Sequence, residues 1–256
     1  MKRAILFRFH KNFEVCQNHL ELIRLFNPNI SVYGLYGGLG KNFKQAKQLK
    51  LDNIYNIPID DWYWKWLNGD LSIRWWFKDV GYKFKFDMIH VFEWDMILLD
   101  SVNSYFRHIK KGIAITNKQP MSKIYNSWYW VAPKRGRGEW LELKKIVKSK
   151  YKFISQPLAG IFGGVCLSRK FLERYLAEER IGSLCNDEVR TILYAQAYGM
   201  PVQDTGMKNG LYGFDDDNIE PSRVYWHYAR GLKAFHPVRE KLDLEKIMKI
   251  KKEKEL

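Results

Sequence analysis

Apolar and polar positions follow two alternating patterns along this chain. Short apolar runs predict strands, and apolar residues spaced three or four apart predict helices. In the first half the expected strands are 4–9, 30–36, 54–57 and 86–99, and the expected helices are 14–26, 41–50 and 60–80. The last helix is broken at Asn68 and Gly69. This alternation predicts an α/β fold, with a mainly parallel sheet and helical crossovers.

The second half continues the alternation less regularly. Its expected helices are 100–110, 139–149, 169–179 and 187–198, and its expected strands are 112–116, 159–167, 202–203 and 225–228. Residues 128–130 are interpreted as an edge strand or a lid, and 241–256 as an exposed basic helix. Asp215–Asp217 lie among Gly, Asn and Pro, which favours a turn over a metal site.

Two carboxylates interrupt the apolar stretch 86–99. Glu93 and Asp95 flank Trp94, and burying a carboxylate is costly unless it is paired or bound to a metal. In a strand, residues i and i+2 point to the same side. At the carboxyl end of a strand, where α/β proteins bind ligands, the pair could hold a divalent ion against a phosphate. A solvated strand end is the alternative.

Composition narrows the class of protein. The chain has 43 Lys and Arg against 28 Asp and Glu, a net charge of +15, which favours nucleic acid, an anionic membrane face or a phosphorylated substrate as partner. Three widely spaced cysteines indicate free thiols in a reducing compartment. No apolar run approaches the roughly 18 residues of a membrane span. We therefore expect a cytoplasmic protein and leave open a peripheral contact with an anionic membrane.

Aromatic residues are frequent, with ten Trp and fifteen Tyr. Most rings between 62 and 77 are expected in the core, but some of them, or those at 128–130, could stack on a base or a sugar. Arg74 lies among them, and a cation amid rings usually has an anionic partner or a stacking face. The basic, glycine-rich loop 134–138 could close on phosphates or could simply be solvated.

In this order the segments resemble GT-A-type glycosyltransferases, with Glu93-Trp94-Asp95 at the place of the DxD motif and Glu in its first position. The resemblance implies a GT-A-like, Rossmann-related, mixed but mostly parallel sheet flanked by helices. It also implies one domain over 1–240, divided into a nucleotide-binding half (1–100) and an acceptor half (101–240), followed by the tail 241–256.

The same resemblance implies a metal site. Glu93 and Asp95 would hold Mn²⁺ or Mg²⁺ against the diphosphate of a nucleotide-sugar donor, most typically a UDP-sugar. A late histidine usually completes such a site. His227, with Lys233 six residues later, and His236, which begins the sequence His-Pro-Val-Arg, both match, and the choice between them stays open.

The remaining implied roles concern the nucleotide and the acceptor. Donor-binding positions would be Arg8, His10, Gly37, Gly38, Arg74, Trp94 and Lys233. Arg8 could equally form a structural salt bridge, and the two glycines could form only a turn. Asp187 or Glu188 would be the general base of an inverting enzyme, although both could instead only complement a helix dipole.

The sequence thus predicts a metal-dependent glycosyltransferase of the hexosyltransferase type, active in polysaccharide biosynthesis or on lipid-linked or protein acceptors, with no nucleic acid as partner. The alternatives are a basic nucleic-acid-binding protein and a metal-dependent nucleotidyltransferase. The donor sugar, the acceptor and the oligomeric state are left open.

Overall fold

The computed structural model describes all residues except 153–154, 180, 213–217 and 256. Asp215–Asp217, interpreted above as a turn, therefore lie outside the described residues.

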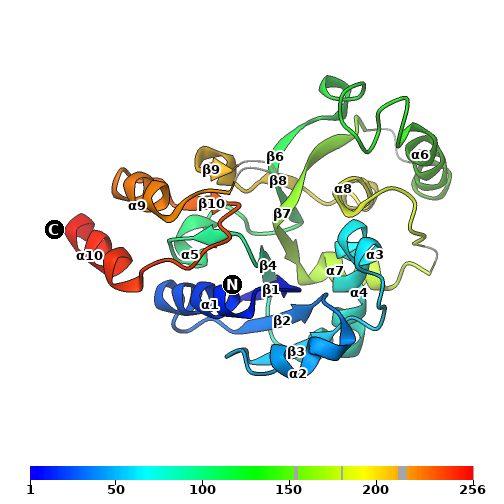
Figure 1. The fold of residues 1–256 in the computed structure, drawn as a ribbon. Helices are drawn as coiled ribbons and strands as arrows, with labels where there is room; N and C mark the ends of the chain where they lie inside the picture. The colour runs from blue at the N-terminus through cyan, green and yellow to red at the C-terminus, as the bar shows by residue number, and fades with distance from the viewer. Residues whose placement is uncertain (153–154, 180, 213–217, 256) are drawn as a thin grey trace.

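A mixed seven-stranded sheet forms the centre of the molecule (Figure 1). Its strand order is β3-β2-β1-β4-β7-β6-β8. Every neighbouring pair is parallel except β4–β7 and β6–β7, because β7 runs against the others. The strands are β1 (Arg3–Phe9), β2 (Val32–Tyr36), β3 (Asn53–Asn56), β4 (Met88–Glu93), β6 (Ile113–Pro120), β7 (Leu158–Ser168) and β8 (Val202–Asp204). The expected α/β class with a mostly parallel mixed sheet is confirmed.

A second, three-stranded sheet has the order β5-β10-β9. It consists of β5 (Ile97–Leu98), β10 (Ala234–His236) and β9 (Leu211–Tyr212). β5 and β10 are antiparallel, with Phe235 opposite Ile97 and Ala234 opposite Leu98. This pairing brings the late part of the chain back to the end of the apolar stretch 86–99.

Helices cover both faces of the main sheet. They are α1 (Phe13–Phe26), α2 (Phe43–Ala46), α3 (Trp62–Leu67), α4 (Gly69–Asp79), α5 (Val102–Tyr105), α6 (Arg137–Tyr151), α7 (Arg169–Leu176), α8 (Asp187–Ala197), α9 (Pro221–Ala229) and α10 (Leu244–Glu255). Alternate residues of β1 enter different cores: Leu6 packs on the side of α4, α7 and α8, whereas Ile5 and Phe7 pack on the side of α1. No helix among the described residues is both long and apolar enough to cross a bilayer.

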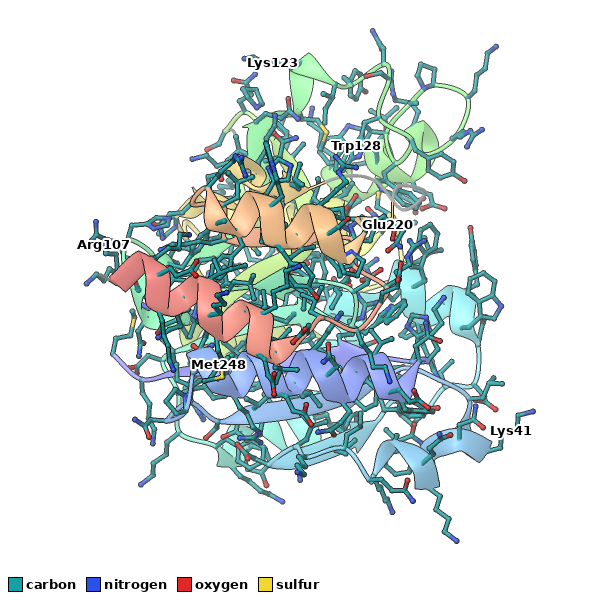
Figure 2. The ribbon with its side chains drawn as sticks, turned by 60° about the vertical axis from the view of Figure 1, so that its left-hand side comes forward. Lys41, Arg107, Lys123, Trp128, Glu220 and Met248 are labelled. Carbon is teal, nitrogen blue, oxygen red and sulfur yellow. The ribbon has the colours of Figure 1, made fainter. Side chains whose placement is uncertain are left out.

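The carboxyl-terminal helix α10 packs against α9, as Figure 2 shows. Ile247 on its inner side is fully buried, whereas Met248, labelled in the figure, is exposed. The expected helix is therefore present, and its apolar residues attach it to a third core that α1 and α9 share.

Some elements differ from the sequence prediction. Residues 225–228 belong to helix α9 and not to a strand, because Pro221 begins a helix that buries Val224 and Tyr228, four residues apart, on one side. Residues 128–130 form turns and not an edge strand. The helices expected at 41–50 and 100–110 shorten to α2 and α5. The predicted break at Asn68 and Gly69 is present, between α3 and α4.

Candidate active site

A cavity of about 490 Å³ lies at the carboxyl ends of β1, β2 and β4. This is the end of a parallel sheet at which α/β proteins bind ligands. Six residues predicted from the sequence line the cavity: Arg8, His10, Gly37, Glu93, Trp94 and Asp95. The structure therefore brings together the positions expected near the nucleoside and those expected at the metal.

The two carboxylates that line this cavity lie close to one imidazole. Glu93 ends β4, Asp95 lies in the following turn, and His236 ends β10. Each offers a ligand atom within 4.8 Å of the others, and His236 Nε2 lies 3.7 Å from Asp95 Oδ1. Two carboxylate oxygens and one imidazole nitrogen suit Mn²⁺, and the oxygens also suit Mg²⁺. The residues present therefore fit the metal that the sequence predicts.

Strand pairing explains why His236, and not His227, is at this cluster. In the antiparallel register of β5 and β10, Lys233 O accepts from Leu99 N (2.8 Å), and Val238 N donates to Asp95 O (2.7 Å). The segment from Lys233 to Val238 therefore runs from the end of β5 back to Asp95. His236 lies in this segment, two residues before Val238, and so reaches the carboxylates. His227 lies in α9, before this strand, and is not part of the cluster.

The acidic cluster is surrounded by cations. Arg8 Nη1 lies 3.2 Å from Glu93 Oε1, and Arg239 Nε lies 3.5 Å from Asp95 Oδ2. Burial raises the pKa of Asp95, His236 and Arg239 oppose this effect, and the charge of Glu93 adds to the increase. A bound cation would relieve the desolvation cost of this buried carboxylate.

Arg8 connects three elements around the cavity. It pairs with Glu93 on β4, donates to Lys65 O at the end of α3 (2.7 Å), and lies 3.7 Å from Asp187 at the start of α8. Arg8 thus forms the salt bridge that was its alternative interpretation and lines the cavity as well.

Sequence analysis missed Lys65. Its side chain is buried in α3, burial lowers its pKa, and its Nζ donates to Gly38 O (2.8 Å). Lys65 is the one cation among the rings of Trp62–Leu67, and that signal could have identified it. Lys11 and Arg239 also line the cavity, so its lining includes four cations, whose charge favours an anionic ligand.

Asp187 and Glu188 have different environments. Asp187 is buried and accepts from Gly69 N (3.0 Å). A Cβ at Gly69 would lie 2.5 Å from both Arg8 Nη1 and Asp187 Oδ2, so a larger residue there would displace these two side chains. Glu188 is only partly buried and accepts from Trp130 Nε1 (2.8 Å) and Phe162 N (3.2 Å).

The pKa values of these two acids are both raised. Burial raises the pKa of Asp187 well above its ordinary range, with Arg8 opposing. Burial also raises the pKa of Glu188 to about 7, against the hydrogen bonds from Phe162, Trp130 and Asn186. Glu188 is linked to the cavity through Trp130, whose ring centroid lies 5.6 Å from that of the lining residue Trp66. An acid with a pKa near neutrality in such a place has the property that a general base needs.

Lys233 and Arg74, two predicted donor-binding residues, lie outside the lining of the cavity. Lys233 pairs with Asp100 (2.6 Å) beside a second hollow of about 310 Å³. Arg74 donates to the backbone carbonyls of Tyr175, Leu176 and Glu178 at the end of α7. These partners are neutral carbonyl groups that the helix end leaves without an intrahelical donor, and not the anionic group or stacking face expected from the sequence.

The two glycines at the end of β2 differ. Gly37 lines the cavity, and a Cβ there would make only ordinary van der Waals contact, with Ile57 at 3.7 Å, so a small side chain could be accommodated. Gly38 is not among the lining residues; its missing side chain makes room for the Tyr36 hydroxyl and the His10 carbonyl.

A buried ion pair holds α8 against α4. Arg190 is fully buried and donates twice to Asp70 (2.7 and 2.5 Å) and once to Asn68 Oδ1 (2.9 Å). Replacing Arg190 by Met would leave Asp70 as an uncompensated buried charge. We expect the free energy of unfolding, measured by urea denaturation, to fall by about 3–5 kcal/mol.

The matched control is Lys241→Met, which removes an exposed lysine paired with Glu14 (3.1 Å). This change should alter stability by less than about 0.5 kcal/mol. Equal losses in both variants would contradict a special role for the buried pair.

Among known proteins, this chain shows only distant similarities, and these are to solved structures. No protein-family model matches the chain, and no curated protein matches it by sequence. It is similar to the structure of the galactosyltransferase LgtC in complex with donor and acceptor sugar analogues (12% identity, 78% of this chain and 72% of that one, TM-score 0.41). It is also similar to the glycosyltransferase GlyE of Streptococcus pneumoniae TIGR4 (12% identity, 93% of this chain and 55% of that one, TM-score 0.43).

A third similar structure is mouse xyloside xylosyltransferase 1 (13% identity, 78% of this chain and 82% of that one, TM-score 0.37). All three are glycosyltransferases, as the resemblance of the sequence implies. Similarities this distant carry no argument about chemistry, which has to come from the residues of the cavity.

Proposed function

We propose that the protein is a metal-dependent glycosyltransferase, which moves a sugar from a nucleoside-diphosphate sugar to a hydroxyl group of a glycan, lipid-linked or protein acceptor. The observation that carries this proposal is the meeting of Glu93, Asp95 and His236 at a cavity that is also lined by cations. A ligand with both a diphosphate and an uncharged group would use the metal site, the cations and the apolar lining together.

Charge develops on the diphosphate as it leaves. A divalent ion held by Glu93, Asp95 and His236 would supply Lewis-acid neutralisation of that charge. Lys65 and Arg239 line the same cavity and would stabilise the same oxygens by charge-assisted hydrogen bonds. Mn²⁺ suits a donor set that includes an imidazole, and a UDP-sugar is the first donor to test.

Glu188 would act as the base that takes the proton from the acceptor hydroxyl. It is the more accessible of the two acids at the start of α8, and its pKa of about 7 suits proton transfer near neutral pH. Asp187, which is buried against Gly69 and Arg8, would position α8 instead. A base on the acceptor implies a reaction that inverts the anomeric carbon.

A thermal-shift panel tests this function. It uses UDP, GDP, CMP and common nucleotide sugars, each with and without Mn²⁺. We expect one nucleoside diphosphate to raise the melting temperature only with metal, and its sugar ester to release that diphosphate during turnover. Release of pyrophosphate would identify a nucleotidyltransferase instead. A shift with oligonucleotides alone would identify a nucleic-acid-binding protein.

The two histidines should behave differently in that assay. His236→Ala should weaken Mn²⁺ binding at least tenfold, because it removes one of three proposed ligands. His227→Ala should leave it unchanged, since His227 is outside the cluster. The measurement is a Mn²⁺ titration of the nucleotide-dependent thermal shift. Equal effects of the two changes would remove His236 from the proposed site.

A further inference from the structure

Five aromatic side chains form a continuous row beside the cavity. We call Trp62, Tyr63, Trp66, Trp130 and Tyr129 the aromatic row. Successive ring centroids lie 5.7, 5.9, 5.6 and 4.6 Å apart. The first three rings come from α3 and the last two from the segment before α6, so tertiary structure joins them.

The row is exposed. Trp62 is 70% exposed, and Tyr63, Trp66 and Tyr129 are 47%, 48% and 46% exposed. Trp62, Tyr63 and Trp66 of α3 are all exposed, whereas Lys65 of the same helix is buried. Exposed apolar surface on this scale usually marks a place where something binds.

Both parts of the row reach the proposed active site. Trp62 and Trp66 line the cavity with Glu93 and Asp95. Trp130, the fourth ring, donates from Nε1 to Glu188 Oε2 (2.8 Å). The row therefore runs from the proposed donor site past the proposed base, which is where an acceptor must lie.

We propose that the aromatic row binds the acceptor, and that this acceptor is a saccharide chain of several residues. This inference rests on the proposed function. Pyranose rings present flat C–H faces that pack on aromatic rings, while their hydroxyl groups remain available to indole N–H and phenol groups. A nucleobase would cover only part of the row, whereas a chain of sugars can contact successive rings.

A lipid surface is the other occupant that exposed Trp and Tyr suit. A membrane pressed against Trp62 and Trp66 would cover the cavity that these residues line. Continuity with the cavity and with Glu188 therefore favours the saccharide.

The test uses two rings that do not line the cavity. Binding of cellotetraose, maltotetraose, chitotetraose and mannotetraose, and of the corresponding disaccharides, is measured by saturation-transfer NMR and titration. We expect at least one tetrasaccharide to bind more tightly than its disaccharide. The double variant Tyr63→Ala/Tyr129→Ala should weaken that binding about tenfold. The double variant Tyr63→Phe/Tyr129→Phe keeps both rings and should bind as tightly as the unmodified protein.

The matched control is Tyr82→Ala, because Tyr82 is 49% exposed and lies outside the row; it should bind like the unmodified protein. Absence of binding by every tetrasaccharide would overturn the inference, as would equal losses in the Tyr82 variant. Sedimentation with phosphatidylglycerol vesicles that depends on Tyr63 and Tyr129, without saccharide binding, would overturn it in favour of a membrane surface.

The nucleotide panel keeps the two proposals separate. The double variant should keep the metal-dependent nucleotide shift. A nucleotide shift without saccharide binding would refute the proposed saccharide-binding role of the aromatic row, but it would still support the transferase function. Saccharide binding on the row without any nucleotide shift would support the row as a saccharide site and refute the transferase.

Discussion

Replacing Asp95 by Asn should reduce sugar transfer by about 1000-fold and remove the metal-dependent part of the nucleotide thermal shift. The carboxylate is buried beside Glu93, His236 and Arg239, and in the proposed site it is one of three ligands of the metal. Asn has nearly the same shape but cannot neutralise a divalent ion. A 1000-fold loss corresponds to about 4 kcal/mol of transition-state stabilisation, within the several kcal/mol that a Lewis acid supplies.

The matched control is Asp100→Asn. Asp100 is a partly buried carboxylate paired with Lys233 (2.6 Å) and follows Asp95 closely in the chain, but it lies outside the cavity. It should keep transfer within a few-fold of the unmodified protein. Near-normal activity of Asp95→Asn, or an equal loss in Asp100→Asn, would refute the metal site as assigned.

The parallel half of the fold was predictable because each strand and helix carries its own local pattern. β1 and β4 are mostly apolar, with Ala4–Phe7 an unbroken apolar run in β1, as is typical of strands buried on both faces. The strand expected at 225–228 was wrong because the ring-rich sequence obscured the helical spacing of Val224 and Tyr228 and the start at Pro221.

The carboxylates of the site were also predictable, since Glu93 and Asp95 interrupt an apolar run. A late histidine was predicted too, but the choice between His227 and His236 could not be made from the sequence. His227 and His236 are close in sequence, and only the long-range pairing of β10 with β5 places one of them at Asp95. Lys65 was missed for a related reason: the backbone of Gly38, to which it donates, is remote in the chain.

Glu188 is the residue for which structure adds most to sequence. Sequence could not choose between Asp187 and Glu188, because both stand in the first turn of α8. Burial and partners separate them. Asp187 is enclosed by Gly69 and Arg8, whereas Glu188 is joined to the aromatic row through Trp130.

Glu188→Gln should therefore lower the turnover number about 1000-fold while the metal-dependent nucleotide shift persists, because a general base acts only on the acceptor proton. Asp187→Asn should cost less than about tenfold, since its amide oxygen can still accept from Gly69 N. The matched control is Glu139→Gln, which alters a glutamate that accepts from Cys185 N (2.8 Å) close to the start of α8. Steady-state kinetics with the donor identified above measures all three.

The pH dependence gives an independent signature of Glu188. With a pKa of about 7, its carboxylate form decreases below neutrality, so turnover should fall tenfold per pH unit there, and the Gln variant should lack that limb.

The same pKa shift makes stability change with pH in the opposite direction to turnover. Because folding raises the pKa from 4.5 to about 7, the folded state binds the extra proton in that window, and unfolding free energy falls as pH rises through it. The difference in melting temperature between the unmodified protein and Glu188→Gln should therefore change between pH 4.5 and 7 and be constant above. A turnover within tenfold of normal in Glu188→Gln, with the acidic limb intact, would show that Glu188 is not the base.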